Sequence, residues 1–456
     1  MDSLTDSLAA YINELNYSSL SQRVVDKAKM CILDFCGVAL ADCFLKSNEI
    51  LIKMIEEFGG KPECTVIGHN GLKVPAHYAT LANCAMAQTL ELDDGHRFGG
   101  LHPGAVVIGT ALAIGERQKC SGKHLIAATV AGYEVMIRMG MTTHPMQCLR
   151  GHHNTVTCGV LGAAATAAKL LELDRKAVMN ALAIAGTLGL LGPEGFLYIG
   201  SMVKGIPAGV AAHNGVISAM LAARGFTGPP EILEGHKGYL QALTGEVDQH
   251  WVAKAAKDYQ RDPEILRVFH KFHASCRHTH PAIDAVLAIA ENNRIEPEKI
   301  DSVKVVTYPI AAELVYNHKG YPLVAKFSIP YCVALACLQR RVGLMDFTNE
   351  RVKDSSIQEI SNKVHVISDS TVDFPLKRTT TVEIKMKDGR KYSHTLDYPY
   401  GCPEWPADWQ DVVAKFNGLM DGIIDQRRSK KIEDTVSHID RVKEVTELAE
   451  TLGESV

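Results

Sequence analysis

Residues 159–171 read Gly-Val-Leu-Gly-Ala-Ala-Ala-Thr-Ala-Ala-Lys-Leu-Leu, and this composition indicates the fold of the first half of the chain. A helix built from this segment is apolar on nearly every face, which is typical of the middle of a helical bundle. Its alanines and glycines let neighbouring helix axes approach closely. Five other segments share this character: residues 78–90, 104–116, 123–139, 175–189 and 208–224. We therefore predict a large all-helical domain over residues 1–265.

The pattern changes after residue 265. Three segments show the alternation of half-buried strands, and the last two flank an Asp-Gly hairpin turn: residues 300–308, 379–386 and 391–395. Two helices are expected beside them: residues 281–292 and 325–340. We therefore predict a mainly α protein with a smaller α+β domain over residues 266–399. Residues 400–456 return to an amphipathic helical pattern, and we expect them to pack back on the helical domain.

Length and composition exclude several classes of protein. The chain of 456 residues exceeds what one hydrophobic core usually supports, and 46% hydrophobic with 22% charged residues is ordinary for a soluble enzyme. A net charge of −4 gives no basic field for a nucleic acid. The acidic N-terminus does not resemble a signal peptide, and no apolar run reaches the roughly 20 residues that span a bilayer. We expect a cytoplasmic protein with neither a nucleic acid nor a membrane as its partner.

The sequence also argues against a bound cofactor. The twelve cysteines include no C-x-x-C pair, which favours buried, reduced thiols over a disulfide framework or a zinc site. The chain has no P-loop and no G-x-G-x-x-G motif after a strand, so a nucleotide cofactor is not expected.

The densest group of ionisable residues lies at 91–104, Glu-Leu-Asp-Asp-Gly-His-Arg-Phe-Gly-Gly-Leu-His-Pro-Gly. Three carboxylates, two imidazoles and a guanidinium lie between segments expected to be buried helices. Charged groups are rarely buried unless they are paired or used in function. Asp93 and His102 are therefore candidate acid/base residues. The structural alternative is a helix end whose acids pair with Arg97.

Four further polar segments could contribute to the same site: residues 151–159 with His153, 200–209 with Lys204, 270–281 with Lys271, Cys276 and Arg277, and 316–322 with Tyr316. The first two precede buried helices, whose N-termini favour anions. Thr155 or Thr157 could cap one of these helices. Each segment also has a structural interpretation as a cap, a solvated lysine or a packed aromatic.

Residues 270–281 contain four histidines, and the spacing of His278 and His280 permits metal ligation. No second ligand pair of fixed spacing accompanies them, so a cationic pocket for a polycarboxylate fits the composition better. Fixed cations neutralise substrate carboxylates and any enolate-like charge, and a histidine, lysine or tyrosine moves the proton. The combined residues thus indicate proton abstraction alpha to a carboxylate without a metal.

The chain resembles the MmgE/PrpD family. The matching motifs run in order from about residue 5 to 400: residues 90–94 (LELDD) with 102–104 (HPG), 151–155 (GHHNT) with the helix after it, 204–209, 225–229 (GFTGP), 271–276 and 325–331 (AKFSIPY). This resemblance implies a large helical domain, a smaller α+β lid domain, a homodimer and a site in the cleft between the domains. It also implies cofactor-independent chemistry on small di- and tricarboxylates.

Carried over residue by residue, the resemblance implies catalytic roles for six residues: Asp93, His102, His153, Lys204, Lys271 and Tyr316. Many members have a threonine shortly after the two acids, where this chain has Arg97, which could supply a different anion contact. Cys276 stands near a position at which decarboxylase members carry a histidine. Arg97, Cys276 and Arg277 are therefore candidate substrate-binding residues.

The resemblance leaves the reaction open. The leading interpretation is a hydro-lyase similar to 2-methylcitrate dehydratase, with His102 or His153 as the base and the lysines holding carboxylates. The alternatives are a carboxy-lyase similar to cis-aconitate decarboxylase, and an epimerase similar to iminodisuccinate epimerase in which Cys276 and His102 face each other across one carbon. Outside enzymes, the alternative is a non-catalytic carboxylate-binding paralogue, against which the complete set of ionisable residues argues.

Overall fold

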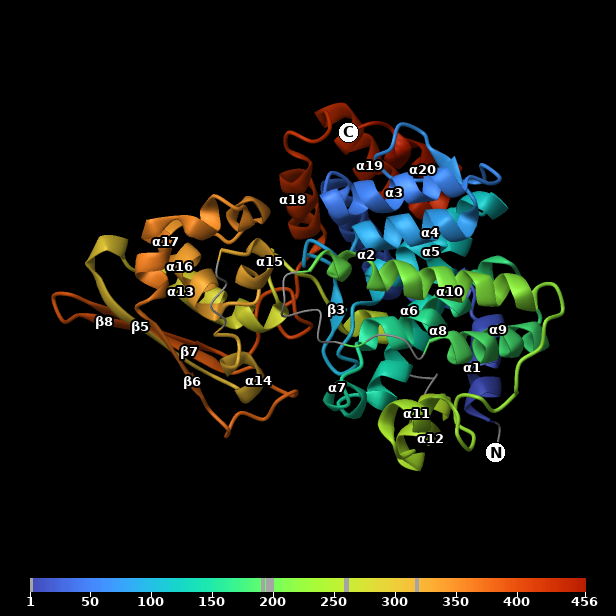
Figure 1. Cartoon of the computed structure of the whole chain (residues 1–456), viewed down its shortest axis with the longest axis horizontal. Coiled ribbons are helices and arrows are strands. Elements are labelled where there is room, and N and C mark those ends of the chain that lie inside the picture. Colours follow the sequence, from blue (N-terminus) through green and yellow to red (C-terminus); the bar gives the residue numbers. More distant parts are fainter. Residues whose placement is uncertain (1–2, 190–192, 194–200, 258–261, 316–319) are drawn as a thin grey trace.

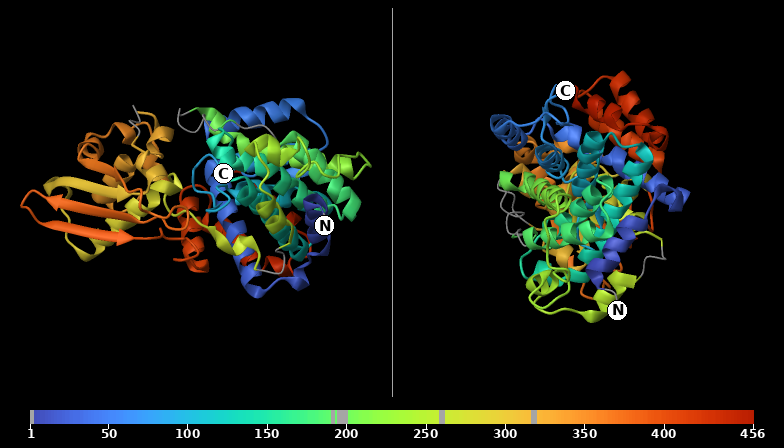
Figure 2. Two further views of the ribbon diagram at one scale, coloured as in Figure 1. Left: turned by 90° about the horizontal axis from the view of Figure 1, so that it is seen from below. Right: turned by 90° about the vertical axis from the view of Figure 1, so that its right-hand side faces the viewer.

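The computed structural model describes residues 3–189, 193, 201–257, 262–315 and 320–456, and it confirms the mainly α fold. A large helical body is formed by the first half of the chain, and a smaller α+β domain lies at one end of it (Figure 1). Figure 2 shows the sheet extending beside the helical body rather than covering it.

The helical domain contains helices of 4 to 22 residues. Its helices are α1 (Leu4–Glu14), α2 (Gln22–Asp42), α3 (Lys46–Phe58), α4 (Ala76–Met86), α5 (Pro103–Gln118), α6 (Gly122–Thr143), α7 (Met146–Leu149), α8 (Asn154–Leu170), α9 (Arg175–Leu188), α10 (Pro207–Ala222), α11 (Tyr239–Thr244) and α12 (Gln249–Lys257). Two short strands, β1 (Cys64–Thr65) and β2 (Lys73–Val74), pair antiparallel between α3 and α4. All six helices expected from the sequence are present.

Helix α8 is the centre of this domain, because α5, α6, α9 and α10 all pack against it. Small residues make that packing possible. A Cβ built on Gly215 of α10 would lie only 2.5 Å from the Ala163 Cβ of α8 and 2.6 Å from the carbonyl oxygen of Val160. The glycine is therefore required where the two helices meet.

The α+β domain contains a four-stranded sheet in the order β6-β5-β7-β8. Strand β5 (Ile300–Thr307) runs parallel to β6 (Val364–Ser368) and antiparallel to β7 (Thr380–Met386), and β7 pairs antiparallel with β8 (Lys391–Leu396). The helices of this domain are α13 (His280–Asn292), α14 (Pro309–Ala312), α15 (Pro322–Ala325), α16 (Ile329–Gln339) and α17 (Ser355–Ser361). Helices α13 and α16 pack against the sheet.

Two features of this domain differ from the sequence expectation. The single helix predicted over 325–340 is divided into α15 and α16, because the Ser328 hydroxyl caps α16 by accepting from the Tyr331 amide and Pro330 occupies its first turn. Strand β6 was not expected. Its exposed residues lack the regular alternation from which β5 and β7 were predicted.

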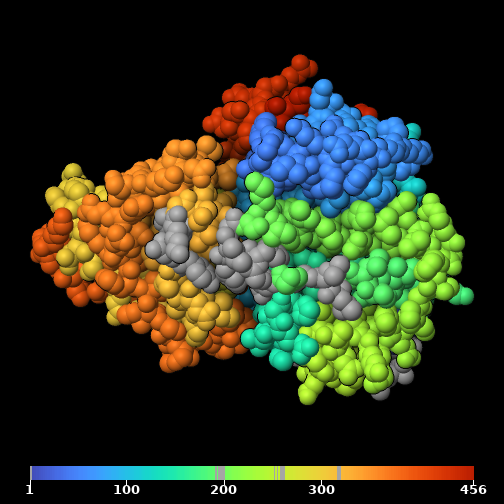
Figure 3. Space-filling model, viewed as in Figure 1, coloured from blue at the N-terminus to red at the C-terminus, as the bar shows by residue number. Residues whose placement is uncertain are grey.

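The C-terminal helices α18 (Trp409–Met420), α19 (Gln426–Ser437) and α20 (Thr446–Gly453) lie against the helical body (Figures 1 and 3). Helix α18 packs on α2, where the ring of Phe416 lies over Gly37. No helix among the described residues is both long and apolar enough to cross a membrane. All twelve cysteines belong to the described part of the chain, and each is a free thiol.

Candidate active site

The segment between α4 and α5 forms the floor of the candidate site. Helix α4 ends at Met86, and Glu91 adopts a left-handed backbone conformation with φ of +59°. Such a conformation costs an ordinary L-residue about 1–2 kcal/mol. It therefore marks a place where the surrounding structure, rather than local preference, fixes the backbone.

A short strand pair brings a distant segment to this loop. Strand β3 (Gly95–His96) pairs antiparallel with β4 (Val268–Phe269), so that Lys271, two residues after β4, lies beside the loop. A Cβ on Gly95 would lie 2.5 Å from the ring of Phe269, so only glycine permits this approach. The domain junction and the acidic loop therefore form one site.

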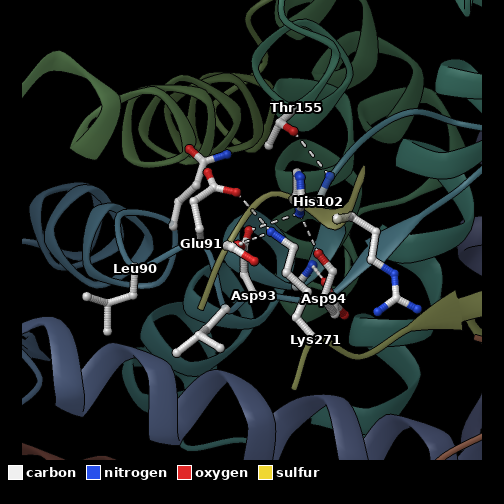
Figure 4. Close-up of polar contacts among 12 residues, drawn as sticks. Leu90, Glu91, Asp93, Asp94, His102, Thr155 and Lys271 are labelled. Carbon is white, nitrogen blue, oxygen red and sulfur yellow. Dashed lines mark hydrogen bonds and ion pairs between the residues drawn. The ribbon is translucent and has the colours of Figure 1, made fainter. Parts of the chain in front are cut away.

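The centre of the site is a buried array of charges. The Glu91 carboxylate lies 2.6 Å from the Lys204 ammonium and 3.0 Å from the Lys271 ammonium, which is also 3.6 Å from Asp93. Lys204 comes from a short 3-10 helix, η3 (Met202–Gly205), directly before α10. The side chains of these residues are buried. Figure 4 shows Lys271 directed toward Glu91 and Asp93, which both lie on the segment between α4 and α5.

These ion pairs keep the array charged. Burial by itself would raise the pKa of the Glu91 carboxyl, but the Lys204 and Lys271 ammonium groups hold that pKa well below its usual range. Burial opposes the charge on Lys271, and Glu91 and Asp93 overcome it and raise the pKa of that ammonium. Two cations thus remain in a water-poor site, where they interact strongly with an anionic ligand.

His102 lies next to the array, and one of its ring nitrogens forms a hydrogen bond that orients the ring. Its Nδ1 lies 2.6 Å from the backbone carbonyl oxygen of Asp94 and 3.3 Å from the Asp93 carboxylate (Figure 4). A carbonyl oxygen only accepts, so Nδ1 carries the proton and Nε2 has the free electron pair. Burial lowers the pKa of His102, although Asp93 raises it. The ring is therefore neutral at physiological pH and can accept a proton at Nε2.

His153 is the second histidine of the site, at the N-terminus of α8. Burial, together with the nearby Lys204 and His102, lowers the pKa of His153 to about 3, so the ring is uncharged. The expectation that Thr155 or Thr157 caps α8 is wrong. His153 occupies the cap position, Thr155 accepts from the backbone N–H of His102, and the Thr157 hydroxyl donates to Gln147.

Asp94, the neighbour of Asp93, joins the loop to helices α5 and α6 by hydrogen bonds. Its carboxylate accepts from the Tyr133 hydroxyl of α6 at 2.6 Å and from the Gly104 amide of α5 at 2.8 Å. Burial raises the pKa of Asp94 to about 7. A Cβ on Gly104 would lie within 2.8 Å of this carboxylate, so the glycine of the HPG motif is needed for the contact.

The structure places both candidate arginines in contacts other than the array. Arg97 forms an ion pair with Glu404 at 2.5 Å and lies over the Phe98 ring. Arg277 donates to the backbone carbonyl oxygens of Pro399 and Tyr400 and lies over the Phe269 ring. These contacts join residues 399–404 to the domain junction. The expected substrate-binding role of the two arginines is therefore not supported by their position.

Of the two remaining candidate residues, Cys276 lies in the described part of the chain and Tyr316 does not. Burial, with the Glu91 charge as a second cause, raises the pKa of the Cys276 thiol to about 11, so this group is protonated and unsuited to act as a base at neutral pH. Tyr316 lies outside the described residues.

The histidines of 270–280 have different polar partners, although the rings of His273 and His280 lie 4.9 Å apart. His273 contacts Asp284, His278 contacts the Tyr308 hydroxyl, and His280 contacts Arg277. Within the described ranges, no group of three or more His, Cys, Asp or Glu side chains is arranged to hold a metal ion.

Two residues of the site were missed by the sequence analysis. Glu91 lies in the 91–104 segment but is not among the predicted site residues, although it contacts both lysines. Lys326 is buried and donates from Nζ to the carbonyl oxygen of Leu90 at 2.6 Å. Its position in the A-K-F-S motif was the available signal, because that motif supported the family resemblance.

The comparisons with known proteins agree with this architecture. The MmgE/PrpD N-terminal domain model matches residues 6–251, and the MmgE/PrpD C-terminal domain model matches residues 273–441. The chain belongs to the MmgE/PrpD family. The C-terminal model extends into α18 and α19, beyond the four-stranded sheet.

The curated relatives of this MmgE/PrpD protein include several cis-aconitate decarboxylases. The cis-aconitate decarboxylase-like protein oryM of Aspergillus oryzae is 26% identical over 98% of this chain and 96% of the relative. Cis-aconitate decarboxylase of Aspergillus terreus is 24% identical over 99% and 96%, and that of Homo sapiens is 24% identical over 91% and 87%. The similarity therefore covers both domains.

Proposed function

We propose that the protein is a cofactor-independent carboxy-lyase acting on a small unsaturated tricarboxylate, with cis-aconitate as the first substrate to test. The observation that carries the proposal is the buried Lys204–Glu91–Lys271 array beside a neutral His102. The curated relatives favour a carboxy-lyase over the 2-methylcitrate dehydratase expected first from the sequence.

The reaction requires a group that accepts the electron pair of the broken carbon–carbon bond and an acid that supplies one proton. As the carbon–carbon bond to one carboxylate breaks and CO2 leaves, its electron pair moves through the adjacent double bond to the carbon alpha to a second carboxylate. Lys204 and Lys271 stabilise the negative charge that develops on this carboxylate. One proton then joins the alpha carbon, giving a five-carbon dicarboxylate with a terminal methylene group.

His102 is the proposed proton carrier. The negative charges of a bound tricarboxylate raise the pKa of a nearby imidazole, so His102 takes up a proton at Nε2 when substrate binds. The contact of Nδ1 with the Asp94 carbonyl oxygen fixes the orientation of the ring. Asp93 stabilises the imidazolium until the proton is delivered.

Proton NMR in deuterated buffer tests the proposal. We expect cis-aconitate to lose CO2 and the product to carry one deuterium at the carbon alpha to a carboxylate. Loss of water from 2-methylcitrate, without decarboxylation of cis-aconitate, would instead establish the hydro-lyase. Deuterium exchange into iminodisuccinate without net change would establish the epimerase.

Two controls define the chemistry. His102→Asn should abolish deuterium incorporation while the urea midpoint stays close to wild type. A strong chelator should leave the rate unchanged, and activity that is lost with chelator and restored by a metal would refute the cofactor-free mechanism. Binding of tricarboxylates without turnover of any acid in the panel would favour the non-catalytic paralogue.

A further inference from the structure

The turn Leu90–Glu91–Leu92 is held on both sides by lysines from distant parts of the chain. Lys326 donates to the carbonyl oxygen of Leu90 at 2.6 Å, and Lys415 donates to the carbonyl oxygen of Leu92 at 2.7 Å. Lys326 lies between α15 and α16 of the α+β domain, whereas Lys415 lies on α18. The two carbonyl groups flank the one residue of the turn with a left-handed backbone, Glu91.

The two lysines differ in whether a nearby carboxylate neutralises the charge of the ammonium group. The Lys415 ammonium also contacts the Asp34 carboxylate at 2.5 Å, so its charge is neutralised locally. For Lys326, no carboxylate of the described residues lies within ion-pair distance, and its second contact is the Phe347 ring, 5.2 Å from Nζ. A buried ammonium without a close counter-ion is costly, and such groups mark functional positions.

Lys326 also connects the turn to the Lys271 segment. Its backbone carbonyl oxygen accepts from the Cys276 amide at 2.9 Å, five residues after Lys271. One residue of the α+β domain therefore contacts the segments that carry Glu91 and Lys271, which themselves form an ion pair.

We propose that Lys326 is a positioning residue that fixes the Glu91 turn, and with it the Lys204–Glu91–Lys271 array, when the α+β domain packs on the helical body. Lys415 holds the other side of the turn from within the helical body, because α18 packs on α2. The inference rests on the proposed function only in that the array is taken as the active site.

The first test does not depend on the substrate. Hydrogen exchange of the full chain, measured by mass spectrometry, should be faster in peptides spanning residues 88–96 for Lys326→Met than for the wild type, with little change elsewhere. Lys385→Met is the matched control, since Lys385 lies in the same domain and forms a surface pair with Asp301. Equal exchange in residues 88–96 for the Lys326 variant and the wild type would overturn the proposal.

The second test uses turnover. A displacement of about 1 Å in a catalytic group can reduce the rate about a hundredfold, so Lys326→Met should lower kcat by ten- to a hundredfold with a smaller change in KM. Lys326→Arg, which keeps a charged donor, should recover part of the loss. A kcat within twofold of wild type for Lys326→Met would overturn the positioning role. If this variant does not fold, Lys326→Gln replaces it in both tests.

A pH profile separates positioning from a general packing role. Burial lowers the pKa of Lys326 to about 8, with Lys271 and Lys204 adding to this shift and Glu91 and Asp42 opposing it. The wild-type kcat should therefore decrease above about pH 8. In Lys326→Arg this decrease should begin at a higher pH. Asp42 titrates in the same range. If the decrease of kcat above pH 8 disappears in Asp42→Asn but is unchanged in Lys326→Arg, the decrease belongs to Asp42. That result would overturn the assignment to Lys326.

The two proposals fail in different ways. If no acid in the panel is converted but exchange in residues 88–96 rises in Lys326→Met, the proposed function is wrong and the positioning role stands. If cis-aconitate is converted equally by wild type and Lys326→Met, the positioning role is wrong and the proposed function stands.

Discussion

At the scale of single residues, Glu91 determines the electrostatics of the site. It is a buried carboxylate between two buried ammonium groups, in a backbone conformation that its residue type does not favour. Two cations so close together would repel each other without it. Glu91 therefore holds Lys204 and Lys271 in place by ion pairs and raises the pKa of Lys271, which is the kind of preorganisation that electrostatic catalysis requires.

Lys204→Met should reduce kcat/KM by about 10²–10³, the usual loss when one group that stabilises developing charge is removed. Stability should fall by less than the roughly 3–5 kcal/mol of a fully broken buried pair, since Lys271 still neutralises Glu91. Steady-state kinetics and urea unfolding measure the two effects. Lys61→Met, at an exposed pair with Glu63, is the control. A loss of stability of 3 kcal/mol or more would show that Lys204 is mainly structural.

At the scale of elements, the sequence predicted the helices of the first domain because their small apolar residues leave few alternatives to burial in a bundle. It also gathered Asp93, His102, Lys204 and Lys271, whose segments the structure joins in one site. It did not predict the ion pair of Arg97, because the partner, Glu404, is 307 residues away in the chain. The role of Glu91 depends on a left-handed backbone that no local pattern specifies.

Helix contacts give a paired prediction. Gly215→Ala places a methyl group 2.5 Å from Ala163 where α10 crosses α8, and should destabilise the protein by about 1–3 kcal/mol through overpacking. Gly418→Ala in α18 meets no atom within 4 Å and should stabilise by up to about 1 kcal/mol, because alanine favours helix. Urea midpoints of the two variants measure the difference. Equal effects would mean that close packing of α8 and α10 is unimportant.

At the scale of the whole molecule, buried titratable groups act on stability in two opposite directions. Burial lowers the pKa of nine histidines in the folded protein: His69, His77, His96, His102, His144, His153, His270, His278 and His280. Below their unfolded pKa of about 6.5, the unfolded chain binds more protons than the folded one, so stability falls as the pH decreases.

Burial also raises the pKa of Asp94 to about 7 and of Asp42 to about 8. For these carboxyls the folded state binds more protons, so stability falls as the pH rises from about 4 to 8.

The two effects predict a maximum of stability near pH 6.5. Below it the histidines outnumber the two carboxyls. Above it the carboxyls lower the stability as the pH rises, and Lys326, whose pKa in the folded protein is about 8, acts in the opposite direction. Asp42→Asn, which is neutral and similar in shape, should remove the Asp42 contribution, so that from pH 7 to pH 9 its unfolding free energy falls less, or rises more, than that of wild type. Urea unfolding at unit steps from pH 5 to pH 9 measures both curves. Parallel curves from pH 7 to pH 9 would contradict the assignment, because they would show that Asp42 is already ionised in the folded protein at pH 7.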